Sequence, residues 1–169
     1  MRDELLLHYQ PKMDLPSALM LGMEALVRWQ HPVRGMVPPN DFIALAEDRA
    51  LIIPIGRWVM QAACRQIQAW RQAGLQVPKV AVNLSARQFG DEALVDDMKA
   101  ALQSCGVLTS NIEVGLTESV LMADPERANS VLRWLHNMGV SIAIDDFGMG
   151  YSSLSHLRRF PAPPLHIAA

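Results

Sequence analysis

The chain has 169 residues, which is room for one domain of ordinary size with one hydrophobic core. Hydrophobic residues make up 50% of it and charged residues 19%, so disordered, collagen-like and low-complexity classes are excluded. The formal net charge is −2 without a block of like charge, so we expect no binding to a nucleic-acid polymer. We find no basic secretory leader and no apolar run long enough to span a bilayer, and we expect a soluble, cytoplasmic protein.

The first elements predicted are two strand-like runs at residues 5–9 and 19–27. A short segment containing Pro11, Asp14 and Pro16 joins them, which is typical of an antiparallel hairpin. Residues 54–73 then carry apolar side chains at offsets of three and four and are followed by Gly74, a pattern that predicts a helix.

Strands and helices alternate through the rest of the chain. We predict short buried strands at 80–84, 112–116, 142–144 and 165–167, and helices at 94–105 and 125–138, with a further short helix capped by Ser152 or Ser153. This alternation predicts a parallel sheet, either open and doubly wound or closed as a (β/α)8 barrel, and the periodicity does not choose between them. Cys64 and Cys105 lie on apolar helical stripes and are interpreted as buried free thiols.

Acidic and amide side chains recur where the predicted strands end: Glu24, Asn83, Glu118, and the pair Asp145 and Asp146. Parallel strands bring their C-terminal ends to one face, so these side chains can meet there. A lone Asn or Glu at such a place is also typical of a cap or turn, whereas two adjacent aspartates repel each other and favour a cation. Carboxylate and amide oxygens without clustered His or Cys suit a hard divalent cation, and two such cations suit phosphate-ester hydrolysis.

Six sequence blocks carry a resemblance: YQP at 9–11, EALVRW-x-HP at 24–32, G-x-V-P-P at 35–39, VNLSARQF at 82–89, LTESVLM at 116–122 and IDDFGMGYSSL at 144–154. In this order they resemble the EAL domain family, bacterial phosphodiesterases that hydrolyse cyclic di-GMP to a linear dinucleotide. The resemblance implies an α/β fold, a TIM-type (β/α)8 barrel with an antiparallel first strand pair. Because such a barrel takes about 250 residues, we expect a single EAL domain over 1–169 that is truncated at its C-terminal end. It would be a partial barrel lacking the last two to three βα units, completed by a second copy or a partner.

The resemblance also implies site residues. Glu24, Asn83 and Asp145 would bind one Mg²⁺ or Mn²⁺ ion, and Asp145 would bridge to a second ion that Asp146 also binds. Glu118 would steady the loop that follows Asp146.

The implied ligand is cyclic di-GMP. Arg28 would contact one of its phosphates, while Gln10 and Leu26 would line the pocket. His166 stands where the family has a lysine that is a candidate base, so it is a candidate catalytic residue.

Two departures from the family pattern fall in the site. Gly115 stands where the family has a glutamate that binds metal, and His166 replaces the lysine. We therefore expect impaired or absent phosphodiesterase activity. The alternatives are a non-catalytic module that binds cyclic di-GMP or a protein, and a gene fragment without a function of its own.

Overall fold

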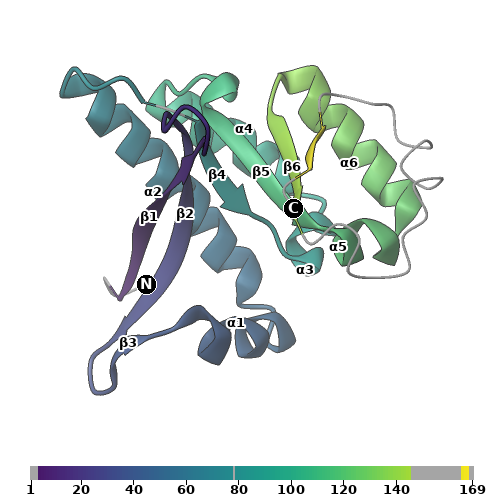
Figure 1. The fold of residues 1–169 in the computed structure, drawn as a ribbon. Helices are drawn as coiled ribbons and strands as arrows, with labels where there is room; N and C mark the ends of the chain where they lie inside the picture. Colours follow the sequence, from purple (N-terminus) through teal and green to yellow (C-terminus); the bar gives the residue numbers. More distant parts are fainter. Residues whose placement is uncertain (1–3, 78, 146–164, 168–169) are drawn as a thin grey trace.

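The computed structural model describes residues 4–77, 79–145 and 165–167 (Figure 1). Its first part is an antiparallel hairpin of β1 (Leu5–Met13) and β2 (Met20–His31), in which Gln10 is the register partner of Glu24. The hairpin confirms the expected strand pair, and both strands run further than predicted. Strand β1 continues to Met13 in register with the start of β2, and the end of β2 pairs with β3 (Gly35–Val37) as well. Helix α1 (Pro39–Asp48) follows, with proline at its first position, where a missing N–H costs nothing.

From β2 onward the sheet is parallel, in the order β1-β2-β4-β5-β6-β7. The added strands are β4 (Lys79–Asn83), β5 (Ile112–Thr117), β6 (Ser141–Asp145) and β7 (Leu165–Ile167). The connecting helices are α2 (Ile52–Gln72), α3 (Ala86–Phe89), α4 (Leu94–Cys105), η1 (Thr109–Asn111), α5 (Glu118–Ala123) and α6 (Pro125–Met138). Figure 1 shows α2, α4 and α6 lying outside the row of strands, as in part of a TIM-type barrel.

Side-chain alternation in the parallel strands separates two faces. The face toward the helices carries bulky apolar residues that are at most 1% exposed: Val80, Val82, Ile112, Val114, Leu116, Ile142 and Ile144. They pack with α2, α4 and α6 in one hydrophobic core. The opposite face carries small or polar residues, among them Ala81, Asn83, Glu113, Gly115, Ser141 and Ala143. A strand period of two thus commits one face to the core and leaves the other to line the inside of the partial barrel.

The helix boundary signals in the sequence are confirmed. The Asp124 side chain accepts a hydrogen bond from the Arg127 backbone N–H at 3.0 Å, and Pro125 opens α6. Gly139 ends that helix in a left-handed conformation with φ +77°, which glycine adopts without strain. Cys64 and Cys105 are both buried and free, as predicted.

The sequence did not predict the short helices α1, α3 and α5. Each has ten residues or fewer, too few for a helical stripe to stand out from the neighbouring strand. The predicted helix after Ser152 or Ser153 lies outside the described residues. Within the described ranges, no helix combines the length and apolar character needed to cross a bilayer.

Candidate functional site

The candidate site lies on the inner face of the sheet, where register relations place its residues in rows. One row runs from Gln10 through Glu24 and Ala81 to Glu113. A second row, one step nearer the C-terminal ends of the strands, runs from Asn83 through Gly115 and Ala143 to His166. Residues 14 to 57 positions apart in the chain are therefore register partners within these rows.

Glu24 and Asn83 are in direct contact. The Asn83 side-chain amide donates a hydrogen bond from Nδ2 to Oε1 of Glu24 at 2.7 Å, which joins β4 to β2. The sequence placed Glu24 at a strand end, but it lies in the middle of β2. It is nevertheless near the last parallel pair of β2 and β4, Ala25 with Val82, because β2 continues beyond β4 to pair with β3. The prediction that these two residues meet is supported by their contact.

A cavity of about 500 Å³ opens beside this pair. Strands β2, β4 and β5 contribute Leu26, Arg28, Asn83 and Thr117 to its wall, and α1 contributes Ile43 and Glu47. The wall therefore combines an apolar surface with a guanidinium, an amide, a hydroxyl and a carboxylate. A cavity of this size with a few convergent polar groups is typical of a small-molecule site.

Three residues were predicted to bind the ligand, and two of them line this cavity. Leu26 and the half-buried Arg28 lie in its wall. Nη1 of Arg28 donates to the carbonyl oxygen of Val27 at 3.0 Å, which occupies one of its N–H groups. Gln10 is exposed beside Glu24 in the register and is not among the described residues that line the cavity.

Gly115, at the position where the resemblance implies a metal-binding glutamate, lies between Asn83 and Ala143 in the second row. Glu113 is on the same face two residues earlier, about 7 Å deeper along the strand. Its carboxylate is 3.5 Å from Nζ of Lys12, and the Glu113 side chain is only 14% exposed. The Glu113 carboxylate is thus paired with the Lys12 ammonium of β1 and does not lie at the position of Gly115.

The remaining predicted residues lie at the ends of later strands. Asp145 ends β6 as the register partner of Thr117, and Glu118 is the half-buried first residue of α5. His166 belongs to β7, opposite Ala143. Asp146 lies outside the described residues.

The donor chemistry of Glu24 and Asn83 fits part of a divalent-cation shell. Their contact fixes the Asn83 amide with Nδ2 toward Glu24, which turns the Asn83 Oδ1 atom away from that carboxylate and makes it available as a ligand. Carboxylate and amide oxygens are ligands that Mg²⁺ and Mn²⁺ accept. Two donors do not complete a shell, and the described side chains include no group of three His, Cys, Asp or Glu able to hold an ion.

Among the described residues, Tyr9 of β1 and Cys64 of α2 have strongly raised pKa values, and both belong to the packing between the sheet and its helices. Burial, with a smaller contribution from Cys64, raises the pKa of Tyr9 to about 12, and the Tyr9 ring packs edge-on against Trp70 at 4.9 Å. Burial also raises the pKa of the Cys64 thiol to about 12. Both groups are neutral near pH 7 and belong to the core, so neither is a candidate nucleophile.

Several residues of the cavity wall were not identified from the sequence: Glu47, Ser85, Gln88, Thr117 and Ser119. Ser85 and Gln88 had a readable signal, since a serine followed three positions later by glutamine is a capping box. Glu47 and Ser119 had none, because they reach the cavity only through the packing of α1 and of the β5–α5 junction.

The fold and the site define a class of protein. A TIM-type sheet whose inner face holds a carboxylate and an amide beside a polar-lined cavity is the architecture of an α/β-barrel domain that binds or transforms a small ligand.

The comparisons then place the chain in a family. The profile of the EAL domain matches residues 1–169, and the chain belongs to the EAL domain family. It is 46% identical over 166 residues to the bifunctional diguanylate cyclase/cyclic di-GMP phosphodiesterase MucR of Pseudomonas aeruginosa, covering 98% of this chain and 24% of that protein. It is also 46% identical over 159 residues to the cyclic di-GMP phosphodiesterase PdeR of Escherichia coli, covering 94% of this chain and 24% of that one. The chain therefore spans about a quarter of the length of these relatives.

Solved structures agree with this assignment. The phosphodiesterase PaMucR in complex with c-di-GMP superposes with a TM-score of 0.90 at 46% identity, over 98% of this chain and 67% of that one. The EAL domain of Xanthomonas citri FimX in complex with c-di-GMP gives a TM-score of 0.79 at 28% identity, over 92% and 59%. These likenesses confirm the predicted α/β, TIM-type fold and the place of the chain among EAL domains of cyclic di-GMP signalling.

Proposed function

We propose that this chain binds cyclic di-GMP in the cavity at Arg28 and Asn83, and that its phosphodiesterase activity is impaired because position 115 lacks a carboxylate. The observation that carries the proposal is the contact of Asn83 with Glu24 directly beside Gly115. Two residues of the expected metal shell meet there, and the neighbouring position in the same row offers no side-chain oxygen.

Binding is supported by the chemistry of the cavity. A cyclic dinucleotide presents two phosphodiesters, which pair with a guanidinium, and flat bases, which pack on apolar surface. Arg28 supplies the cation, while Leu26 and Ile43 supply apolar wall. Relatives whose names include cyclic di-GMP phosphodiesterase share 46% identity with the chain, which favours the same ligand.

Hydrolysis would need divalent ions. The implied ions are Mg²⁺ or Mn²⁺, held by Glu24, Asn83, Asp145 and Asp146, and when bound they would activate a water and stabilise charge on the phosphate. The residues of the chain hold the ligand and orient the amide oxygen of Asn83, but Gly115 contributes no negative charge. Losing even a supporting partner of a metal ligand typically lowers metal affinity about 10- to 100-fold, and we expect at least that here.

Binding is tested by titration calorimetry with cyclic di-GMP, with and without Mg²⁺. Wild type should bind, and Arg28→Ala should abolish binding because the phosphate loses its cation. Arg34→Ala is the matched control, since Arg34 is an exposed arginine in the turn after β2 that does not line the cavity. Undetectable binding by the folded wild-type protein would refute the proposed ligand.

Impairment is tested separately by chromatography of the linear dinucleotide product. Gly115→Glu should raise Mn²⁺ affinity and turnover by about 10- to 100-fold, whereas Gly115→Gln adds similar bulk without the charge and should not. Rapid turnover by wild type that Gly115→Glu leaves unchanged would show that the activity is not impaired at this position.

We also propose that the sheet is completed by pairing at its outer strands, either with a second copy or with a partner chain. Strand β1 and strand β7 each pair with one neighbour among the described strands, and an unpaired strand edge is a template for further pairing. Light scattering after size exclusion tests the homo-oligomer: a monodisperse monomer would exclude it.

A further inference from the structure

We propose that Gln88 is a positioning residue that holds Asn83 in place, and that Gly56 is required because it makes room for the Gln88 side-chain amide. The inference rests on the proposed function only in treating Asn83 as a ligand-site residue. Its geometry is independent of which ligand binds there.

Gln88 is the one polar residue in the buried class among the described residues, with 6% of its surface exposed. It forms both bonds of a capping box at the start of α3. Its backbone N–H donates to Oγ of Ser85 at 3.3 Å, and its side-chain Oε1 accepts from the Ser85 N–H at 3.2 Å. The Gln88 side chain therefore fixes the backbone at Ser85, two residues after Asn83.

The nitrogen of the Gln88 side-chain amide, Nε2, lies against α2 at Gly56. A Cβ placed on Gly56 would lie 1.7 Å from Nε2 of Gln88 and 2.6 Å from its Cδ, which no real contact allows. Gly56 is in the interior of α2 and does not have a positive φ, so its backbone conformation does not require glycine. A helix-interior glycine costs about 0.5–1 kcal/mol relative to alanine. The Gln88 amide occupies the space that an alanine methyl would need, which explains why glycine stands at position 56 despite its lower helix stability.

The contact of the Gln88 amide with α2 is linked to Asn83 through the short segment 83–85. Leu84 alone separates Asn83 from Ser85, and the Leu84 N–H donates to the Gly115 carbonyl at 3.0 Å. Gly56, Asn83 and Gln88 all line the 500 Å³ cavity. A Gln88 amide displaced from Gly56 would therefore release the turn that carries Asn83 and would change the cavity wall at the same time.

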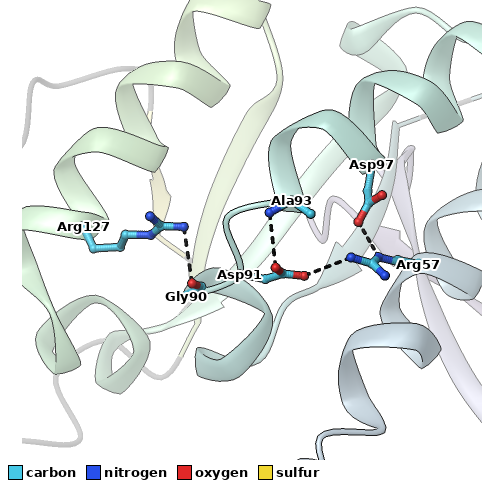
Figure 2. A network of polar contacts seen from close by, with 6 residues as sticks. All are labelled: Arg57, Gly90, Asp91, Ala93, Asp97 and Arg127. Atoms are coloured by element: carbon cyan, nitrogen blue, oxygen red, sulfur yellow. Dashed lines mark hydrogen bonds and ion pairs between the residues drawn. The ribbon is translucent and has the colours of Figure 1, made fainter.

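Polar contacts hold the far end of α3 as well (Figure 2). Arg57, the neighbour of Gly56, pairs with Asp97, and its Nη2 atom lies 3.3 Å from Oδ2 of Asp91. Nη2 of Arg127 donates to the Gly90 carbonyl at 3.3 Å. Two consecutive residues of α2 thus lie near opposite ends of α3: Gly56 leaves room for the Gln88 side-chain amide, and Arg57 pairs with Asp91 just after α3. The Arg57–Asp91 pair holds the C-terminal end of α3, and the two bonds between Gln88 and Ser85 hold the N-terminal end, which is nearer to Asn83.

The test uses Gly56→Ala in the full chain, read by the NMR signals of the Asn83 side-chain amide. Those signals report its hydrogen bond to Glu24 directly. We expect Gly56→Ala to shift or broaden them. Gly90→Ala adds the same methyl group at the other end of α3, where the nearest atom would be 3.6 Å away, and should leave them in place. A Gly56→Ala protein that folds with unchanged Asn83 signals would overturn the inference.

A mutant cycle isolates the role of Gln88. Gln88→Ala should itself perturb the Asn83 signals, and in that background Gly56→Ala should add nothing, because the atoms with which the methyl clashes are gone. If Gly56→Ala perturbs Asn83 equally in both backgrounds, the effect does not pass through Gln88 and the inference is wrong. Should Gly56→Ala fail to fold, Gln88→Ala alone still decides: unchanged Asn83 signals contradict the inference.

Affinity for cyclic di-GMP gives a second readout. We expect Gly56→Ala to weaken binding about fivefold, corresponding to loss of one capping interaction, and Gly90→Ala to leave it unchanged. If wild type does not bind cyclic di-GMP, the proposed function fails while the NMR comparison still decides the role of Gln88. If wild type binds and Asn83 is unmoved by Gly56→Ala, only the present inference fails.

Discussion

Lys12 and Glu113 form an ion pair, and removing the lysine should destabilise the fold measurably. The pair joins β1 to β5 across two intervening strands, with the Lys12 ammonium 3.5 Å from the carboxylate. The side chains are 35% and 14% exposed, so the carboxylate is the more desolvated partner. Lys12→Met keeps most of the lysine stem and leaves that carboxylate without its cation.

The magnitude follows from the separation of the two charges. At 3.5 Å and an effective dielectric constant of about 20, the gross attraction is about 4.7 kcal/mol. Desolvation and the screening of a lysine that is one-third exposed reduce this, and we expect Lys12→Met to lower the free energy of unfolding by about 1–2 kcal/mol. With a urea m-value of about 2 kcal/mol/M, the unfolding midpoint should fall by about 0.5–1 M.

Urea unfolding followed by circular dichroism measures this shift, and an unchanged m-value shows that the unfolded reference is the same. Asp96→Asn is the control, since the exposed pair of Asp96 with Lys99 should contribute less than about 0.5 kcal/mol. In the double variant Lys12→Met/Glu113→Gln the second change should cost less than it does alone. Additive costs, or a Lys12→Met midpoint equal to wild type, would mean that the two charges do not interact as described.

Asp124→Ala removes the side chain that accepts from the Arg127 N–H at the start of α6, and should cost about 1 kcal/mol in urea unfolding. Gly139→Ala should cost more than Gly106→Ala: both need a left-handed backbone, but only at Gly139 would the new Cβ lie 3.3 Å from the Thr109 hydroxyl. Cys64 should resist thiol reagents at pH 8 until the protein unfolds. Because its pKa is about 12 in the fold against an ordinary 9.0, its contribution to stability is complete below pH 9 and is lost as the pH rises toward 12, measurable as a falling midpoint.

Much of this protein could be read from local patterns. The hairpin, the core strands and the long helices follow from hydrophobic periods of two and 3.6, and the boundaries of α6 follow from Asp124, Pro125 and Gly139. The sequence blocks around Glu24 and Asn83 pointed to the family that the comparisons confirm. These features depend on residues that are close together in the chain, so they can be predicted from a single sequence.

The cavity and the polar contacts around it could not be predicted from local sequence patterns. Whether Glu24 touches Asn83 depends on the register between β2 and β4, and the engagement of Glu113 by Lys12 depends on strands 101 residues apart in sequence. That the Gln88 amide fills the space beside Gly56 depends on how α2 packs against α3, which brings together residues 32 positions apart.

The sequence by itself therefore determined the kinds of element, the face that each buries and the chemistry available at the strand ends, because these follow from residue type and local spacing. Only the tertiary structure decided which polar groups meet, which of them are already engaged, and what holds the Asn83 end of β4. Register and helix packing bring together atoms from distant parts of the chain, and their distances are fixed only once the core has formed.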